Sequence, residues 1–132
     1  MIPGTSYSPG KAFINFSHDF FEALTVYDYG TALRKIDVSN GVRWSKKTLT
    51  VALSKALEGA AVCSAKGIEK SANPRVESRD GEFILIHRIP ADGKWSNAVV
   101  FFRFVQRPDS CYFYTFIDDI MSQPPASANA EP

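Results

Sequence analysis

A histidine, an arginine and a tyrosine interrupt three apolar runs between Glu82 and Ile120. His87 lies in EFILIHRI, Arg103 in AVVFFRFVQ and Tyr114 in CYFYTFIDDI. Cleavage of RNA by its own 2′-hydroxyl needs an acid, a base and a cation near the phosphate, and these side chains can supply all three. If they share one face of a sheet, they predict a metal-independent endoribonuclease.

The same segment also contains side chains typical of binding surfaces. Aromatic residues and arginine carry much of the binding energy at protein interfaces. The candidate contact residues are Phe101, Arg103, Tyr112, Tyr114, Trp44 and Trp95. A face of this kind can also stack nucleic-acid bases, with Arg103 and Arg107 at the phosphates. A protein partner is therefore the first expectation and nucleic acid the alternative.

Sequence patterns for metals and cofactors are absent. The chain has two histidines and no Cys-x-x-Cys, so a zinc site is not expected. Asp118 and Asp119 are adjacent, and adjacent residues of a strand point to opposite faces, so they do not readily share a metal. No Gly-x-Gly-x-x-Gly, Walker sequence or catalytic triad spacing is present. We expect no cofactor and no metal, and we lean away from an enzyme.

The elements that must position these residues begin with an antiparallel meander. Three runs rich in aromatic and β-branched residues are separated by PADGKWSN and RPDS. These connections are too short for a parallel crossover. Alternation puts Val100, Phe102 and Phe104 on a core face. It puts Phe101 and Arg103 on the other face, where we expect His87, Tyr112 and Tyr114 to join them.

A first helix is predicted upstream. Ser17 or Asp19 is a candidate N-cap, Asp19 with Glu22 fits a capping box, and Gly30 would end the helix. The preceding residues 12–16 suit either a short strand or the start of that helix.

A short hairpin is predicted next, with strands at about 32–38 and 42–44 around Asn40-Gly41. The alternative is that the first helix continues to Ile36. A second helix should then run from Ser45 to Lys66 and end at Gly67. Residues 75–77 are a candidate for an additional short strand.

These elements predict a two-layer α+β sandwich. Its antiparallel sheet of about five strands, built from the hairpin and the meander, is covered on one face by two helices. We expect one domain over residues 12–121, a flexible arm at 1–11 and a disordered, Pro-, Ala- and Ser-rich tail at 122–132.

Composition limits the compartment and the partner. The 132 residues carry a net charge of +1, which gives no general case for a polyanionic partner. Residues 41–107 are more basic, with twelve basic and six acidic side chains. Cys63 and Cys111 lie in apolar surroundings and suit free thiols. No signal peptide or membrane span is visible, so we expect a cytoplasmic protein.

The favoured function is a non-enzymatic binding module that docks a sheet face or edge on a macromolecule. Small α+β chains of this kind are common among accessory proteins of bacteria and their mobile elements, such as immunity proteins, antitoxins and counter-defence inhibitors. The second candidate is the endoribonuclease using His87, Arg103 and Tyr114. Its layout resembles that of small bacterial ribonuclease toxins at the level of fold alone. The third candidate is a nucleic-acid-binding domain or a ligand sensor with its pocket between helix and sheet. An uncovered edge strand also allows a homodimer.

Overall fold

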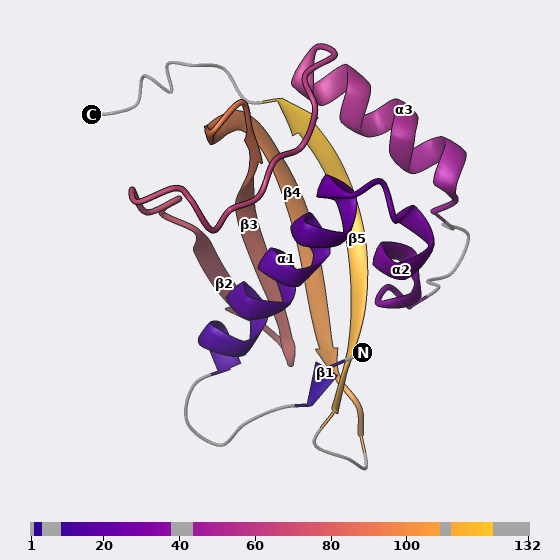
Figure 1. Ribbon diagram of the computed structural model, residues 1–132. Coiled ribbons are helices and arrows are strands. Elements are labelled where there is room, and N and C mark those ends of the chain that lie inside the picture. Colours follow the sequence, from indigo (N-terminus) through magenta and orange to yellow (C-terminus); the bar gives the residue numbers. More distant parts are fainter. Residues whose placement is uncertain (1, 4–8, 38–43, 109–111, 123–132) are drawn as a thin grey trace.

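Five antiparallel strands form one sheet, in the order β1-β5-β4-β3-β2, and helices cover one of its faces (Figure 1). This computed structural model describes residues 2–3, 9–37, 44–108 and 112–122. The elements are β1 (Ile2–Pro3), α1 (Pro9–Thr25), α2 (Tyr29–Arg34), α3 (Lys46–Leu57), β2 (Arg75–Arg79), β3 (Glu82–Ala91), β4 (Lys94–Gln106) and β5 (Tyr112–Ser122). The predicted two-layer α+β class is confirmed.

The C-terminal meander is confirmed as β3, β4 and β5. Two-residue turns connect β2 to β3 and β3 to β4. Asp80 and Gly81 have φ of 46° and 80°, and Asp92 and Gly93 have φ of 56° and 77°. Positive φ at both turn positions is the type I′ geometry, which matches the twist of paired strands. The predicted short strand at residues 75–77 is also confirmed, as β2.

Helix α1 supplies most of the aromatic core and begins earlier than predicted. Ser17 and Asp19 are not N-caps, because residues 12–16 are already helical from Pro9. Five of its side chains are buried against the sheet: Phe13, Phe16, Phe20, Phe21 and Leu24. The Phe13 ring stacks on Phe104, with 4.0 Å between ring centroids. Glu22 makes no capping box; its Oε2 accepts hydrogen bonds from Ser64 Oγ (2.7 Å) and Ala65 N–H (3.2 Å).

The predicted hairpin is wrong over its first strand. Residues 29–34 form α2, which Asp28 caps by accepting a hydrogen bond from the Thr31 N–H at 3.1 Å. Gly30 therefore lies inside a second helix and does not end the first one, which stops at Thr25. The alternative, α1 continuing to Ile36, is also wrong. The expected turn at Asn40-Gly41 lies outside the described residues.

Helix α3 starts where predicted and ends nine residues early. Ser45 is its N-cap and forms a reciprocal capping box with Thr48. The helix stops at Leu57 because Glu58 and Gly59 adopt φ of 53° and 88°. The chain after it is irregular but attached to the sheet, since the Cys63 N–H donates to the Pro90 carbonyl at 2.9 Å.

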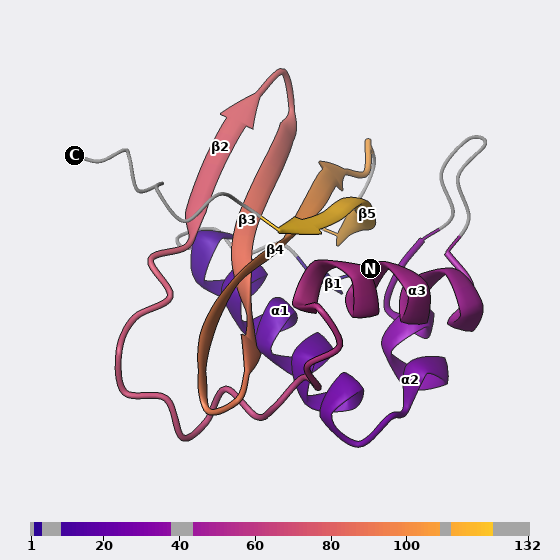
Figure 2. The ribbon, with the colours of Figure 1, turned by 90° about the horizontal axis from the view of Figure 1, so that it is seen from above.

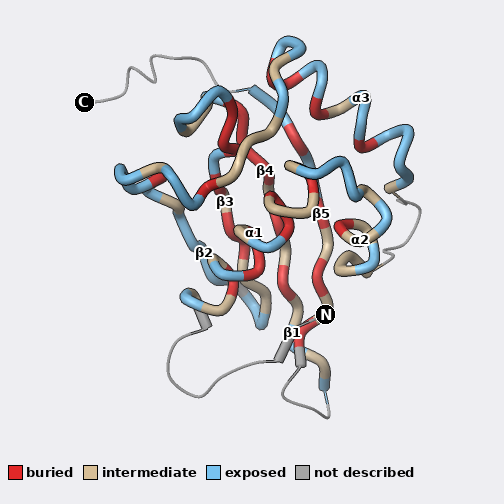
Figure 3. The backbone as a smooth tube through the Cα atoms, in the orientation of Figure 1, coloured by how far each residue is buried: buried red, intermediate tan, exposed pale blue. Residues whose placement is uncertain are grey.

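All three helices lie on the same side of the sheet (Figure 2). The predicted core residues Val100, Phe102 and Phe104 face them and are at most 1% exposed. Leu49, Leu53 and Leu57 of α3 complete the cluster over β4 and β5. Figure 3 shows buried positions along the three central strands. The second face of the sheet, called the open face below, carries no described helix.

The two edges of the sheet differ. The short β1 pairs with Tyr112 and Phe113 of β5. Further along β5, the Asp37 N–H donates to the Thr115 carbonyl (2.7 Å), and Asp37 Oδ2 accepts from the Thr115 N–H (2.8 Å). The Trp44 indole N–H donates to the Ile117 carbonyl at 2.9 Å. These contacts protect the β5 edge, whereas the outer edge of β2 has no strand beside it in the described part of the chain.

The expected arm and tail are described only in part. Within residues 1–11, Ile2 and Pro3 form β1 and the range from Pro9 belongs to α1. Of the expected tail, Ser122 ends β5, and the residues after it lie outside the described part. None of the described helices is long and apolar enough to cross a membrane.

Candidate functional site

The open face carries a cluster of half-exposed aromatic side chains at its centre, around the buried Ile84. Register aligns Ile86, Phe101 and Asp119 across three strands. The next row aligns Ile84, Arg103 and Phe116. The row after that aligns Glu82, Val105 and Tyr114. The predicted contact residues Phe101, Arg103 and Tyr114 therefore do share one face.

Arg103 is the central cation of the open face, and acidic side chains neutralise it. Its Nε donates to Asp118 Oδ1 and Oδ2 at 3.0 and 3.1 Å. Its Nη1 lies 4.0 Å from Glu82 Oε2. The guanidinium also lies over the Phe116 ring, 4.6 Å from the ring centroid. The side chain is 25% exposed, so Arg103 is held as a flat, paired platform rather than as an unpaired cation.

A second cation–aromatic contact extends this arrangement along the sheet. Arg107 lies over the Tyr114 ring at 5.3 Å, and the Tyr114 and Phe116 ring centroids are 6.2 Å apart. Two arginines and two aromatic rings thus form a continuous row near the β4–β5 end of the open face. Tyr112 belongs to β5 and pairs with Pro3.

The open face carries charges of both signs. Its cations include Arg75, Arg88, Arg103 and Arg107, and its carboxylates include Glu77, Glu82, Asp118 and Asp119. Arg75 Nη2 pairs with Glu77 Oε2 at 2.6 Å. Carboxylates thus lie among the arginines of this face, and they weaken the field that a polyanion would meet there.

His87 is not on the open face, and the expectation that it joins Arg103 and Tyr114 is wrong. It pairs with Val100, whose side chain faces the helices. The imidazole is 1% exposed and lies close to Phe21 and Trp95. His87 lies on the opposite face of the sheet from Arg103 and Tyr114, because neighbouring positions of a strand point to opposite faces. The three residues therefore do not form one site.

His87 instead pairs with the other histidine of the chain. His18 Nε2 and His87 Nε2 are 3.2 Å apart, and His87 Nδ1 lies 2.8 Å from the Arg88 carbonyl oxygen. A carbonyl can only accept, so His87 Nδ1 carries a proton, His87 Nε2 accepts, and His18 Nε2–H donates. This bond joins α1 to β3 beneath the sheet.

Burial keeps both imidazoles neutral near pH 7. Desolvation lowers the pKa of His87 to about 4, while its bond to the Arg88 carbonyl raises the pKa and the nearby His18 lowers it. Desolvation also lowers the pKa of His18, against the raising effect of Asp19 and Glu22. Among the described residues, no group of three or more His, Cys, Asp or Glu side chains is arranged to hold a metal ion.

The two tryptophans have structural contacts. Trp44 bonds to Ile117 at the β5 edge, as described above. The Trp95 indole N–H donates to the Lys70 carbonyl at 2.7 Å, and its ring stacks with His18 at 6.0 Å between centroids. Neither indole lies with Phe101 and Arg103, so these two contact candidates are not brought together with the rest.

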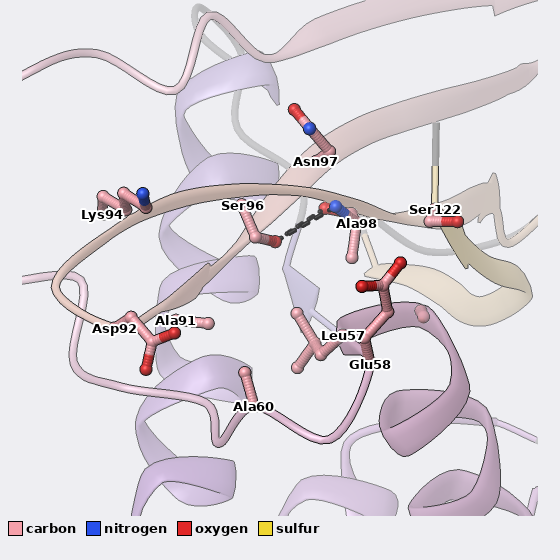
Figure 4. A pocket seen from close by; sticks show the side chains of 11 residues that line it. Leu57, Glu58, Ala60, Ala91, Asp92, Lys94, Ser96, Asn97, Ala98 and Ser122 are labelled. Atoms are coloured by element: carbon pink, nitrogen blue, oxygen red, sulfur yellow. Dashed lines mark hydrogen bonds between the residues drawn. The ribbon is translucent and has the colours of Figure 1, made fainter. Parts of the chain in front are cut away.

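A pocket lies where the end of α3 meets the β3–β4 hairpin (Figure 4). Its volume is about 510 Å³. Leu57 and Ala60 contribute apolar surface, and Figure 4 shows Glu58 and Asp92 at opposite ends with Ser96 between them. The Ser96 hydroxyl is already bonded to the Ile89 carbonyl at 2.7 Å. This is the place between helix and sheet at which a ligand sensor would put its ligand.

Sequence reasoning missed two features around these sites. The pairing of His18 with His87 joins residues 69 positions apart, and no local pattern signals it. The second is the bonding of Asp37 to Thr115 at the β5 edge, which the sequence does not indicate because residues 32–38 are predicted as a hairpin strand. No protein-family model, curated protein or solved structure matches this chain.

Proposed function

We propose that this protein is a non-enzymatic binding module that docks a protein partner on the open face of its sheet. The observation that carries the proposal is the uncovered centre of that face. There Phe101, Phe116 and Tyr114 stay half-exposed although the other face of the same strands is fully packed. Aromatic side chains around a stacked arginine are the composition of interface hot spots.

The charge arrangement favours a protein over a nucleic acid. Arg103 is engaged by Asp118 and lies near Glu82, so a phosphate would have to compete with two carboxylates. A mixed set of positive and negative groups suits a protein surface of mixed charge. Acting by docking, such a module would serve as an accessory or inhibitory protein, as immunity proteins, antitoxins and counter-defence inhibitors do.

A cytoplasmic location is part of this proposal. Cys63 is a free thiol whose sulfur accepts the Gly93 N–H at 3.3 Å. Free thiols persist in reducing compartments, which supports a bacterial or other cytoplasm as the place of action. The endoribonuclease hypothesis loses its residue set, because His87 lies on the other face from Arg103 and Tyr114.

Affinity capture with matched variants tests the proposal. The tagged chain, the double variant Phe101→Thr/Phe116→Thr and the control Val51→Thr are each incubated with nuclease-treated lysate. Threonine suits strands, so the double variant should keep its sheet. Val51 serves as the control because it is an exposed apolar residue of α3, on the helix layer (58% exposed). We expect one stoichiometric protein that binds the wild-type chain and the control and is lost with the double variant. Equal capture by all three baits would overturn the proposal.

A further inference from the structure

The outer edge of β2 is a second surface with unused bonding capacity. β2 pairs with β3 from Arg75↔Ile86 to Arg79↔Glu82, and no described strand lies along its other side (Figure 1). Arg79 and Glu82 flank a two-residue turn and so exchange backbone hydrogen bonds. The same bonding toward β3 recurs at every second residue, at Glu77 and Arg75. The N–H and C=O groups of the residues between them, Val76 and Ser78, therefore point outward.

The side chains along this edge are exposed and alternate in character. Val76 is 41% exposed, which is high for a large apolar side chain. Arg75 and Glu77 project from the open face, with side chains 67% and 48% exposed. Opposite charges therefore lie two residues apart on one side of the strand, and an apolar residue lies between them on the other.

We propose that β2 is a homodimerisation edge, in which two copies of this chain pair antiparallel about a two-fold axis at Val76. Each Val76 then exchanges two backbone hydrogen bonds with Val76 of the second copy. Arg75 lies opposite Glu77 of the second copy, and Glu77 lies opposite its Arg75. Opposite charges in directly facing positions stabilise an antiparallel pair, and the two valines cover each other.

The neighbouring registers are less favourable. An axis at Glu77 sets Glu77 against Glu77 and Arg75 against Arg79, and facing like charges destabilise a pair. An axis at Ser78 sets Val76 against Asp80, whose φ of 46° belongs to the turn and not to a strand. The axis at Val76 also sets Ser78 against Pro74, where the Ser78 N–H can donate to the proline carbonyl. Proline has no N–H to return to the Ser78 carbonyl, so the hydrogen-bonded ladder ends at this pair.

Such a dimer has a consequence for the whole surface. A two-fold axis through an antiparallel pair stands perpendicular to the sheet, so the two open faces lie on the same side. The dimer would present one continuous sheet face with two copies of the aromatic centre.

Molecular mass in solution is the first test. Sedimentation equilibrium over a range of concentrations should give twice the 14.6 kDa chain mass at the upper end. Val76→Pro removes an outward N–H that β3 does not use, so it should give a folded monomer. The control Val76→Thr keeps that N–H and should still dimerise. A wild-type chain that stays monomeric throughout, or a dimer unaffected by Val76→Pro, would overturn the proposal.

A charge-exchange experiment tests the pairing of side chains. Arg75→Glu alone and Glu77→Arg alone each bring like charges together, and each should weaken self-association at least tenfold. An equimolar mixture of the two variants should regain dimers, because each pair then joins a glutamate to an arginine. If either variant alone dimerises like the wild type, the arrangement is refuted.

Cysteine crosslinking tests the register. Val76→Cys should give a disulfide-linked dimer on oxidation with diamide, beyond any background from the unaltered chain, because the two thiols face each other across the axis. Ser78→Cys should not, because Ser78 faces Pro74. Crosslinking of Ser78→Cys without crosslinking of Val76→Cys would refute the axis at Val76.

Discussion

At the scale of single residues, the bonded imidazoles of His18 and His87 link the fold to pH. Protonating His87 would require charging Nε2, the atom that accepts the bond from His18. His18 can take a proton on Nδ1 and keep donating from Nε2. The burial of His87 and its role as acceptor therefore both oppose its protonation in the folded state.

The resulting prediction concerns stability in mild acid. The pKa of His87 drops from 6.5 to about 4 on folding, so between these values the unfolded chain binds a proton that the folded chain does not. The free energy of unfolding should hold its full value above pH 6.5 and fall by about 3 kcal/mol as the pH decreases to 4. Urea denaturation at pH 7.0, 5.5 and 4.5 measures it. In His87→Gln most of this slope should disappear; an unchanged slope would contradict the assignment.

A second residue-scale prediction concerns Thr115. Its side chain is fully buried, and its hydroxyl has no hydrogen-bond partner among the described residues. Valine has the same shape without the polar group and suits a strand. Thr115→Val should raise the free energy of unfolding by roughly 1 kcal/mol. Thr115→Ser, which keeps the hydroxyl and loses a methyl group, should lower it. A destabilised valine variant would show that the hydroxyl is satisfied.

The sequence correctly predicted that Phe101, Arg103 and Tyr114 share one face, and it misplaced His87. Alternation along one strand separates Phe101 and Arg103 from Val100 and Phe102 without further information. To predict which face His87 shares with the residues of β4, the register between β3 and β4 must be known, and no local sequence pattern gives it. A slip of one residue exchanges the two faces of a strand. His87 pairs with Val100 and so belongs to the buried face.

At the scale of elements, the sequence indicates some helix ends clearly and others ambiguously. The start of α3 at Ser45 is predictable, because a side-chain oxygen just before an apolar helical stripe can accept a hydrogen bond from the first turn. The start of α1 is ambiguous, because Pro9 and Gly10 suit the predicted flexible arm at 1–11 as well as the first turn of a helix. The early end of α3 depends on Glu58 in a left-handed conformation, for which glutamate gives no signal.

The protected edge of β5 gives an element-scale prediction. The indole N–H of Trp44 bonds to the Ile117 carbonyl, and the ring packs against the core. Trp44→Phe keeps an aromatic ring and removes the donor, so the free energy of unfolding should fall by about 1 kcal/mol, with some further loss of packing. Partner capture should not change. Loss of capture without loss of stability would instead make Trp44 a contact residue, as its residue type suggests.

At the scale of the whole molecule, the helix layer and the open face of the sheet have different roles. The helix layer and the inner face of the sheet hold the aromatic core, and the open face retains partly exposed aromatic rings among charges of both signs. The class and the meander were predictable because hydrophobic periodicity determines them. Which segments form the outer strands of the sheet was not predictable, since β1 has only two residues and the expected first hairpin strand folds as α2.

The central claim is that the open face binds a protein partner, and an affinity measurement tests it most directly. The captured partner is titrated against the wild-type chain, Phe101→Ala and the control Val51→Ala, each first checked for an unchanged fold by circular dichroism. We expect the Kd to rise at least tenfold for Phe101→Ala, about 1.4 kcal/mol, and to stay within about twofold for Val51→Ala. Equal affinity for all three chains would contradict the claim. A larger loss for Val51→Ala would contradict it and move the binding surface to the helix layer.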